Sequence, residues 1–325
     1  MSGIIIGSLS AQDLYRIRVD RKEGLIDKMG KTVVPAKFDK LLAFHDGLAA
    51  FKSGAKYGFI NSSGKIVIPA QFDKVHDFAE GLAPVKKSDR WFYIDKSGNK
   101  KFDIVANFAY SFSEGLARFQ LGSKFGYLDK TGKTVIDAKY VRAYDFHEGK
   151  ARVQQNNKWG FIDKNGVIVI KPTYDYVWDF SEGMANFLVG DERTGKWGFI
   201  DKSGKQVIPA KYDKAFGFHS GRALIRKGNF KTGKFGYIDK TGKIVIDPQF
   251  DGAYNFSDGV ANIAVGMGSA RKWGYVDPSG KVIIARQFSK PADFKKGLAL
   301  VRIGDFKSGT EGYINKTGKF VWKRQ

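Results

Sequence analysis

The sequence contains no cysteine, and it has only 8 prolines and 4 histidines among its 325 residues. The absence of cysteine excludes disulfides, thiolate metal sites and a cysteine nucleophile. A zinc site needs three or four converging ligands, whereas His45, His147 and His219 share one recurring position that holds serine or lysine in other copies. We therefore expect no metal site, no cofactor and no catalytic residue.

Long apolar runs are also missing, because none approaches the roughly 18 residues that a membrane-spanning helix requires. Residues 1–12 include the short apolar run Ile4–Ile6 but lack the basic stretch that opens a secretory signal. Two interpretations stay open. If this segment is the remnant of a signal, we expect a protein of the cell envelope or a secreted one, and otherwise a cytoplasmic one.

Glycine and aromatic residues are plentiful, with 39 glycines and 14% aromatics, which is typical of short strands joined by tight turns. One unit recurs along almost the whole chain. It has an aromatic-Gly-aromatic strand such as 197–201, a turn, a β-branched strand such as 244–246, and a third strand such as 222–225. An aspartate before each turn can cap it, and a glycine supplies the positive φ that closes it. The turn glycines are Gly30, Gly64, Gly98, Gly132, Gly166, Gly204, Gly242, Gly280 and Gly318.

The repeat predicts an all-β fold in which residues 13–325 form a single array of three-stranded units. We expect the units to stack as a solenoid-like superhelix, or alternatively to form a closed propeller-like ring. The two ends look complementary, because residues 14–19 read as a lone third strand and residues 312–322 as the first two strands without a third. In a closed ring, these ends would complete one shared unit.

The segments KWGFIDKNG at 158–166 and KWGFIDKSG at 196–204 resemble the WG-repeat (KWG-type β-repeat) family of bacterial proteins. The resemblance implies a repeat-built binding protein without naming a ligand. The third copy departs from the pattern, with Phe92 in place of the glycine and Lys101 in the β-branched strand, so we expect it to be distorted there. In the last copy Glu311 replaces the aromatic residue.

The later copies carry inserts at residues 190–195, 228–233, 266–271 and 304–309. Inserts that recur in a repeat protein lie on one face, which is often the binding face. We expect them to form a ridge, although longer solvated turns would give the same sequence pattern. The candidate binding residues on this ridge are Arg193, Phe230, Lys231, Met267, Arg271, Phe306 and Lys307.

The chain is strongly basic, with 55 Lys+Arg against 33 Asp+Glu and a formal net charge of +22. Regularly spaced lysines in stacked repeats can bind a polyanion, but lysines at turns and edges also keep a β-protein soluble. Our first hypothesis is a non-enzymatic scaffold that contacts another protein through the ridge. The alternative is a binder of nucleic acid or acidic glycan that uses the row Lys124, Lys158, Lys196, Lys234 and Lys272.

Overall fold

The computed structural model describes residues 14–305 and 308–324, and every hairpin of the repeat has the predicted turn chemistry. In the copy at 196–212, Asp201 Oδ1 accepts the backbone N–H of Ser203 at 2.9 Å and that of Lys205 at 3.0 Å. Gly204 takes a φ of 87°, a conformation that glycine adopts without strain. The side-chain hydrogen bonds and the glycine together fix the turn between the first two strands of the repeat.

The glycine between the two aromatic residues allows two backbones to approach closely. Strand β22 (Lys196–Asp201) pairs with β23 (Gln206–Tyr212), and the pairing jumps from Trp197↔Tyr212 to Phe199↔Ile208. At this bulge a Cβ on Gly198 would lie 2.5 Å from the carbonyl oxygen of Ile208. Only glycine fits there, which explains why the residue recurs in almost every copy.

The expected distortion of the third copy is confirmed. Strand β10 (Arg90–Asp95) carries Phe92 at the glycine position and pairs in plain register with β11 (Lys100–Ile104), so that Phe92 faces Asp103. This pairing shifts only further on, between Tyr93 and Ile94. A large side chain is accommodated here because the partner strand does not bulge towards it.

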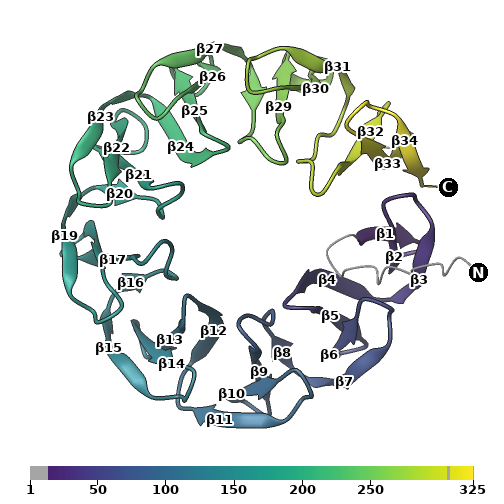
Figure 1. Cartoon of the computed structure of the whole chain (residues 1–325), viewed down its shortest axis with the longest axis vertical. Helices are drawn as coiled ribbons and strands as arrows, with labels where there is room; N and C mark the ends of the chain where they lie inside the picture. Colours follow the sequence, from purple (N-terminus) through teal and green to yellow (C-terminus); the bar gives the residue numbers. More distant parts are fainter. Residues whose placement is uncertain (1–13, 306–307, 325) are drawn as a thin grey trace, which may run out of the picture. The chain divides into compact units, whose positions relative to one another are not determined.

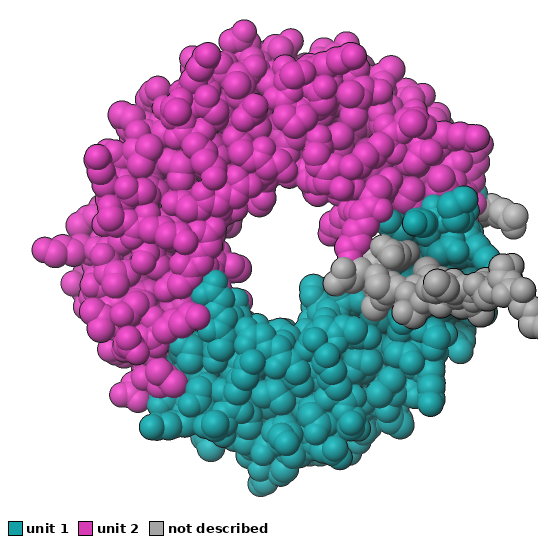
Figure 2. Space-filling model, viewed as in Figure 1, with its two compact units in different colours: residues 1–122, 127–134, 324–325 teal, residues 123–126, 135–323 magenta. Residues whose placement is uncertain are grey.

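Among the described residues the strands form nine small antiparallel sheets. The chain divides into two compact units, residues 1–122, 127–134 and 324–325 and residues 123–126 and 135–323, which are coloured separately in Figure 2. The boundary between the units runs through the fourth sheet. The first sheet consists of β1 (Tyr15–Val19), β2 (Lys22–Ile26) and β3 (Thr32–Phe38), and the second of β4 (Lys40–His45), β5 (Leu48–Ser53), β6 (Lys56–Asn61) and β7 (Ile66–Phe72). The third sheet consists of β8 (Lys74–Val75), β9 (Leu82–Lys87), β10 and β11, and the fourth of β12 (Phe108–Ser113), β13 (Leu116–Leu121), β14 (Lys124–Asp129) and β15 (Thr134–Tyr140).

The second unit continues with five sheets. In those with four strands, the first strand, such as β20, lies on the concave side of the arc that these sheets follow, and the last strand, such as β23, lies on the convex side (Figure 1). A short 3₁₀ turn, η2 (Gly268–Ala270), follows β29. The strands are β16 (Arg142–Ala143), β17 (Ala151–Gln155), β18 (Lys158–Ile162), β19 (Ile168–Tyr174); β20 (Tyr176–Val177), β21 (Met184–Val189), β22, β23; β24 (Lys214–His219), β25 (Arg222–Lys227), β26 (Lys234–Ile238), β27 (Ile244–Phe250); β28 (Gly252–Ala253), β29 (Ala261–Val265), β30 (Lys272–Val276), β31 (Val282–Phe288); and β32 (Leu298–Ile303), β33 (Thr310–Asn315), β34 (Phe320–Lys323).

The all-β class and the tandem repeat are confirmed, and the small sheets are of the β-propeller type, the alternative of the two expected arrangements. Two details differ from the prediction. Seven of the sheets have a fourth strand that was not expected, and the third strand of each copy pairs with the first strand of the following copy. The ends are therefore not halves of one shared unit, because β1 belongs to a three-stranded sheet with β2 and β3, and β32 completes another with β33 and β34.

The hydrophobic core lies between neighbouring sheets. One cluster joins Trp197, Phe199 and Ile208 of the β20–β23 sheet to Phe218 and Ile225 of the next sheet, all of them buried. Phe199 and Phe218 pack with ring centroids 5.0 Å apart. A single sheet could not cover this apolar surface, so each repeat depends on its neighbour for stability.

Ion pairs join neighbouring sheets as well, and we call each such arrangement a clasp. In one clasp the Glu148 carboxylate accepts the backbone N–H of Gly183 at 3.0 Å and lies 2.9 Å from Lys202 Nζ. Burial raises the pKa of Glu148, but the hydrogen bonds from Lys202 and Gly183 outweigh it and hold the pKa below its usual value. The equivalent pairs are Asp46–Lys96, Glu80–Lys130, Glu182–Lys240 and Asp258–Lys316.

Candidate functional site: a cationic groove between two hairpins

The lysine row takes part in the architecture of the sheets. Lys158 Nζ and Lys196 Nζ each lie 2.5 Å from an aspartate, Asp175 and Asp213. Lys234 pairs in the same way with Asp251. The hydrogen bond from Lys158 and a second one from the backbone of Gly190 lower the pKa of Asp175.

The other two members of the row are Lys124 and Lys272. In their copies the position of the paired aspartate is occupied by Val141 and Ser289. Polyanion binding by the row stays a prediction. Because three of its five lysines are each matched by a carboxylate, the row presents much less positive charge than its sequence spacing suggests.

Two of the predicted inserts form hairpins of the same shape. In the hairpin at 190–195, Asp191 Oδ1 accepts the backbone N–H of Arg193 at 2.7 Å and that of Thr194 at 3.0 Å. The side-chain hydrogen bond from Thr194 and these two backbone bonds lower the pKa of Asp191 to about 2. In the hairpin at 228–233, Asn229 Oδ1 accepts the corresponding bonds at 2.9 and 3.0 Å. The ends of both hairpins are therefore fixed from within.

A groove with a volume of about 850 Å³ lies between these two hairpins in the second unit. The first hairpin and the second form its two walls, and strands β24, β25 and β26 form its floor. Its lining contains four cationic side chains and a single carboxylate. The lining residues are Glu192, Arg193, Lys214, Phe216, Arg226, Asn229, Phe230, Lys231, Thr232 and Phe235.

Aromatic rings lie beside the cations of the groove. Phe230 at the tip of its hairpin is 89% exposed, and the Arg226 guanidinium lies 5.8 Å from the centroid of its ring. Lys214 Nζ lies 4.5 Å from the centroid of the Trp197 ring. Burial lowers the pKa of Lys214, so this ammonium group has lost part of its hydration and gains from a nearby negative charge.

The cationic floor is not a constant feature of the repeat: cations face each other at the same two positions in Lys40–Lys52, Lys74–Lys86 and Lys290–Arg302, but not in either neighbouring sheet. At the positions of Lys214 and Arg226, the preceding sheet has Tyr176 and Leu188, and the following sheet has Gly252 and Ala264. What distinguishes the pair of Lys214 and Arg226 is that it lines a groove together with an insert hairpin on each side. Sequence reasoning missed Lys214, Arg226 and the aromatic floor, because basic residues also occur at these two strand positions in other copies and nothing marked this pair.

The remaining candidates of the ridge are placed differently. Arg193, Phe230 and Lys231 line the groove, while Met267 and Arg271 belong to the next insert and do not. Met267 is 66% exposed, and Arg271 Nε donates to the carbonyl of Gly266 at 3.2 Å. Phe306 and Lys307 lie outside the described residues.

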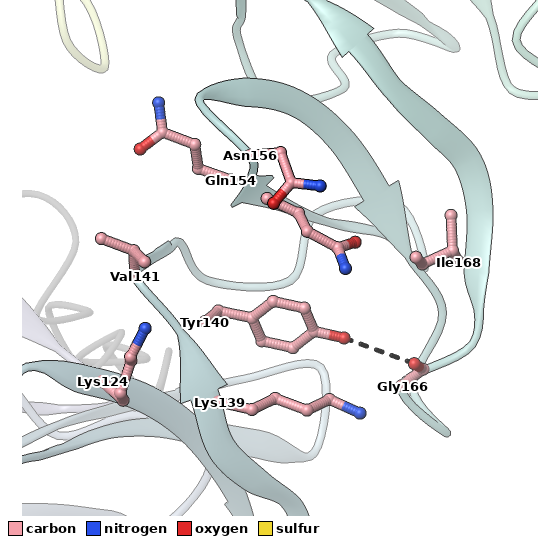
Figure 3. Close-up of a pocket in the computed structure, with 9 residues that line it drawn as sticks. Lys124, Lys139, Tyr140, Val141, Gln154, Asn156, Gly166 and Ile168 are labelled. Atoms are coloured by element: carbon pink, nitrogen blue, oxygen red, sulfur yellow. Dashed lines mark hydrogen bonds between the residues drawn. The ribbon is translucent and has the colours of Figure 1, made fainter.

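Two further cavities are repeat-equivalent crevices between neighbouring sheets. The first, shown in Figure 3, has a volume of about 330 Å³, and the Tyr140 hydroxyl crosses it to the carbonyl of Gly166 at 3.4 Å. In the second, of about 300 Å³, Tyr212 donates to Gly242 at 3.2 Å. The recurrence of the same tyrosine-to-glycine bond indicates that these crevices belong to the packing of the sheets.

A buried arginine, Arg152, forms an ion pair inside the second unit. Arg152 is 3% exposed, its Nε lies 2.8 Å from the Asp179 carboxylate, and its Nη1 donates to the carbonyl of Val177 at 2.9 Å. Its guanidinium stacks 3.6 Å from the centroid of the Tyr144 ring. Burial outweighs the effect of Arg152 and raises the pKa of Asp179. The arginine is held on all sides by protein, so we assign it a structural role.

The described residues include no cluster of three or more histidine, aspartate or glutamate side chains that could hold a metal ion. Within the same residues, no helix is long and apolar enough to cross a membrane.

The repeated small sheets and the glycine-dependent bulge define a tandem-repeat protein of the β-propeller type. The chain belongs to the family of the WG containing repeat, whose model matches it at residues 24–57, 57–91, 91–125, 125–159, 159–192, 197–229, 235–266 and 273–305. This match confirms the resemblance seen in the sequence. No curated protein sequence matches the chain.

Several solved structures are similar in a general way. Hsv2 from Kluyveromyces lactis has 7% identity and a TM-score of 0.42, with 81% of this chain and 91% of that chain covered. An acylaminoacyl peptidase from Pyrococcus horikoshii has 12% identity and a TM-score of 0.41, covering 88% and 52%. The tricorn protease has 13% identity and a TM-score of 0.33, and the match spans 86% of this chain but 34% of the protease. These values are too low for any function to be carried over.

Proposed function

We propose that this protein is a non-enzymatic scaffold that binds another protein through the groove between the hairpins at 190–195 and 228–233. The observation that carries the proposal is the exposed Phe230 beside Arg226 in a groove of about 850 Å³. Aromatic and arginine side chains are enriched in protein interfaces and dominate their binding energy. Two hairpins fixed by internal hydrogen bonds can present such residues with little loss of entropy on binding.

The chemistry of the groove supports binding and not catalysis. Its lining has one carboxylate, Glu192, and no histidine, so it offers no pair of groups for acid–base chemistry. The turn aspartates, such as Asp201, are engaged by the backbone of their own hairpins. The aspartates that recur in the repeat thus have a structural role in their turns.

A pull-down from a lysate of the native host, at low and high salt and with and without nuclease, tests the proposal. We expect a discrete protein band that survives high salt and nuclease and is lost with Phe230→Ala. Val105→Ala is the matched control, because Val105 is 87% exposed and lies in the other unit. Recovery of nucleic acid or acidic glycan that disappears with salt would contradict the proposal and favour the polyanion alternative.

A further inference from the structure

The groove between the hairpins has a distinct chemical character, because its cations and its aromatic rings lie side by side. Lys214 and Arg226 lie on the floor, from β24 and β25, and Arg193 and Lys231 lie on opposite walls. Glu192 is the single carboxylate of the lining. Phe230 adds an exposed aromatic face at the rim. A ligand that fills this groove meets positive charge and, next to it, the aromatic surface of Phe216, Phe230 and Phe235.

We propose that the groove binds an acidic linear segment of a partner protein, one that carries carboxylates next to an apolar side chain. This inference rests on the proposed function and adds the chemistry of the partner. Carboxylates of the segment contact Arg226 and Lys214, since guanidinium groups bind carboxylates in bidentate fashion. The apolar side chain packs against Phe230. Recognition of acidic motifs by clusters of basic side chains is a recurring mode of peptide binding.

Two observations favour a peptide over a nucleic acid as the acidic ligand. The floor cations lie between two insert hairpins, and the cationic surface is interrupted on both sides, where Tyr176 and Leu188 or Gly252 and Ala264 occupy the same positions. A continuous polyanion would be bound best by charges that recur from sheet to sheet. The row lysines beside the groove, Lys196 and Lys234, are matched by aspartates.

The desolvation of Lys214 supports an anionic ligand. Burial lowers the pKa of this side chain, the Glu192 carboxylate partly offsets that effect, and Arg226 adds to it. A carboxylate placed in the groove favours the charged form of Lys214. Binding of the segment is therefore expected to raise the pKa of Lys214, which NMR of the lysine side chain can detect.

The test is fluorescence anisotropy with the full chain and a labelled synthetic peptide in which glutamates flank a single leucine. We expect binding that weakens about tenfold in the Lys214→Gln/Arg226→Gln variant, which corresponds to about 1.4 kcal/mol. The control Lys243→Gln/Lys281→Gln removes the same charge from exposed sites outside the groove, and we expect it to bind like the wild type. The same peptide with glutamines, or with alanine for leucine, is expected to bind more weakly.

Because Lys214 packs on Trp197, its replacement can disturb the fold. The exposed Lys231 provides a second variant, Lys231→Glu, which is expected to weaken the peptide without changing the circular dichroism spectrum. The inference is overturned if the peptide does not bind, if the control variant weakens it equally, or if single-stranded DNA of equal charge binds more tightly through the same residues. If Phe230→Ala still abolishes capture of the partner protein while the peptide fails to bind, the acidic segment is wrong and the scaffold function stands.

Discussion

Replacing Gly198 by alanine tests the reason for the recurring glycine of the repeat. A Cβ at this position would lie 2.5 Å from the carbonyl oxygen of Ile208 and 2.7 Å from the amide nitrogen of Ala210. Both are backbone atoms, so no side-chain rotation can relieve the contact. We expect β22 and β23 to separate locally and to weaken the hydrogen bonds beside the bulge.

The size of the effect follows from the contact. Overpacking a core costs about 1–3 kcal/mol, and a weakened backbone hydrogen bond adds about 1 kcal/mol. Because the obstacle is a backbone, we expect Gly198→Ala to lower the free energy of unfolding by about 3 kcal/mol. The third copy illustrates the alternative, since Phe92 occupies the same position where the partner strand pairs in plain register.

Urea denaturation followed by tryptophan fluorescence measures this loss. Gly217→Ala is the matched control, because Gly217 lies outside the left-handed region and the nearest atom to its Cβ would be Ser181 Cβ at 3.7 Å. We expect this control to change stability by less than about 1 kcal/mol. Equal shifts of the denaturation midpoint in both variants, or no shift with Gly198→Ala, would refute the steric explanation.

Three further predictions concern charged groups. The pKa of Asp191 is lowered to about 2, so the contribution of this carboxylate to the stability of its hairpin is complete above the unfolded pKa of about 3.9 and is lost as the pH falls through about 2. Hydrogen exchange of the hairpin should therefore become faster between pH 4 and pH 2. Unchanged protection would contradict this prediction. Arg152→Met leaves Asp179 without its cation and should lower the free energy of unfolding by about 3 kcal/mol in urea denaturation. Asp179→Asn leaves the more deeply buried Arg152 charged and without this carboxylate, and it should cost at least as much. Lys196→Gln removes an exposed pair with Asp213 and should change the same quantity by less than about 1 kcal/mol, and a larger loss would show that the row is more than a surface feature.

Local chemistry made most of the fold predictable from the sequence. The capping aspartate and the turn glycine, as at Asp201 and Gly204, fix a hairpin within a few residues, so the turns and their flanking strands could be placed. The fourth strand could not, because in β8 and β20 it has only two residues, and in β4, β12 and β24, where it has six, a register shift interrupts its pairing. The repeated sequence also does not show at which strand one sheet ends and the next begins. Only the pairing of strands in space shows that the third strand of one copy joins the first strand of the next.

The candidate site was predictable on its walls and not on its floor. Arg193, Phe230 and Lys231 stood out because they interrupt the repeat as inserts. Lys214 and Arg226 lie on regular strands, and in the sequence each one looks like an ordinary surface residue of a β-strand. Their side chains converge only because β24 and β25 are neighbours in one sheet, which is a property of the pairing and not of the local sequence.

The clasps between neighbouring sheets constrain how a gene for such an array can change length. A carboxylate of one sheet bonds to a lysine of the next sheet, as Glu148 does to Lys202, so a duplication of one whole repeat adds one acceptor and one donor and leaves every clasp in register. At one place both partners of the clasp are replaced, with Ser220 at the acid position and Pro278 at the lysine position. There, Arg222 Nε donates a hydrogen bond to the Pro278 carbonyl at 3.4 Å. Insertions of partial repeats would separate donors from acceptors, so an array built in this way grows and shrinks by complete repeats.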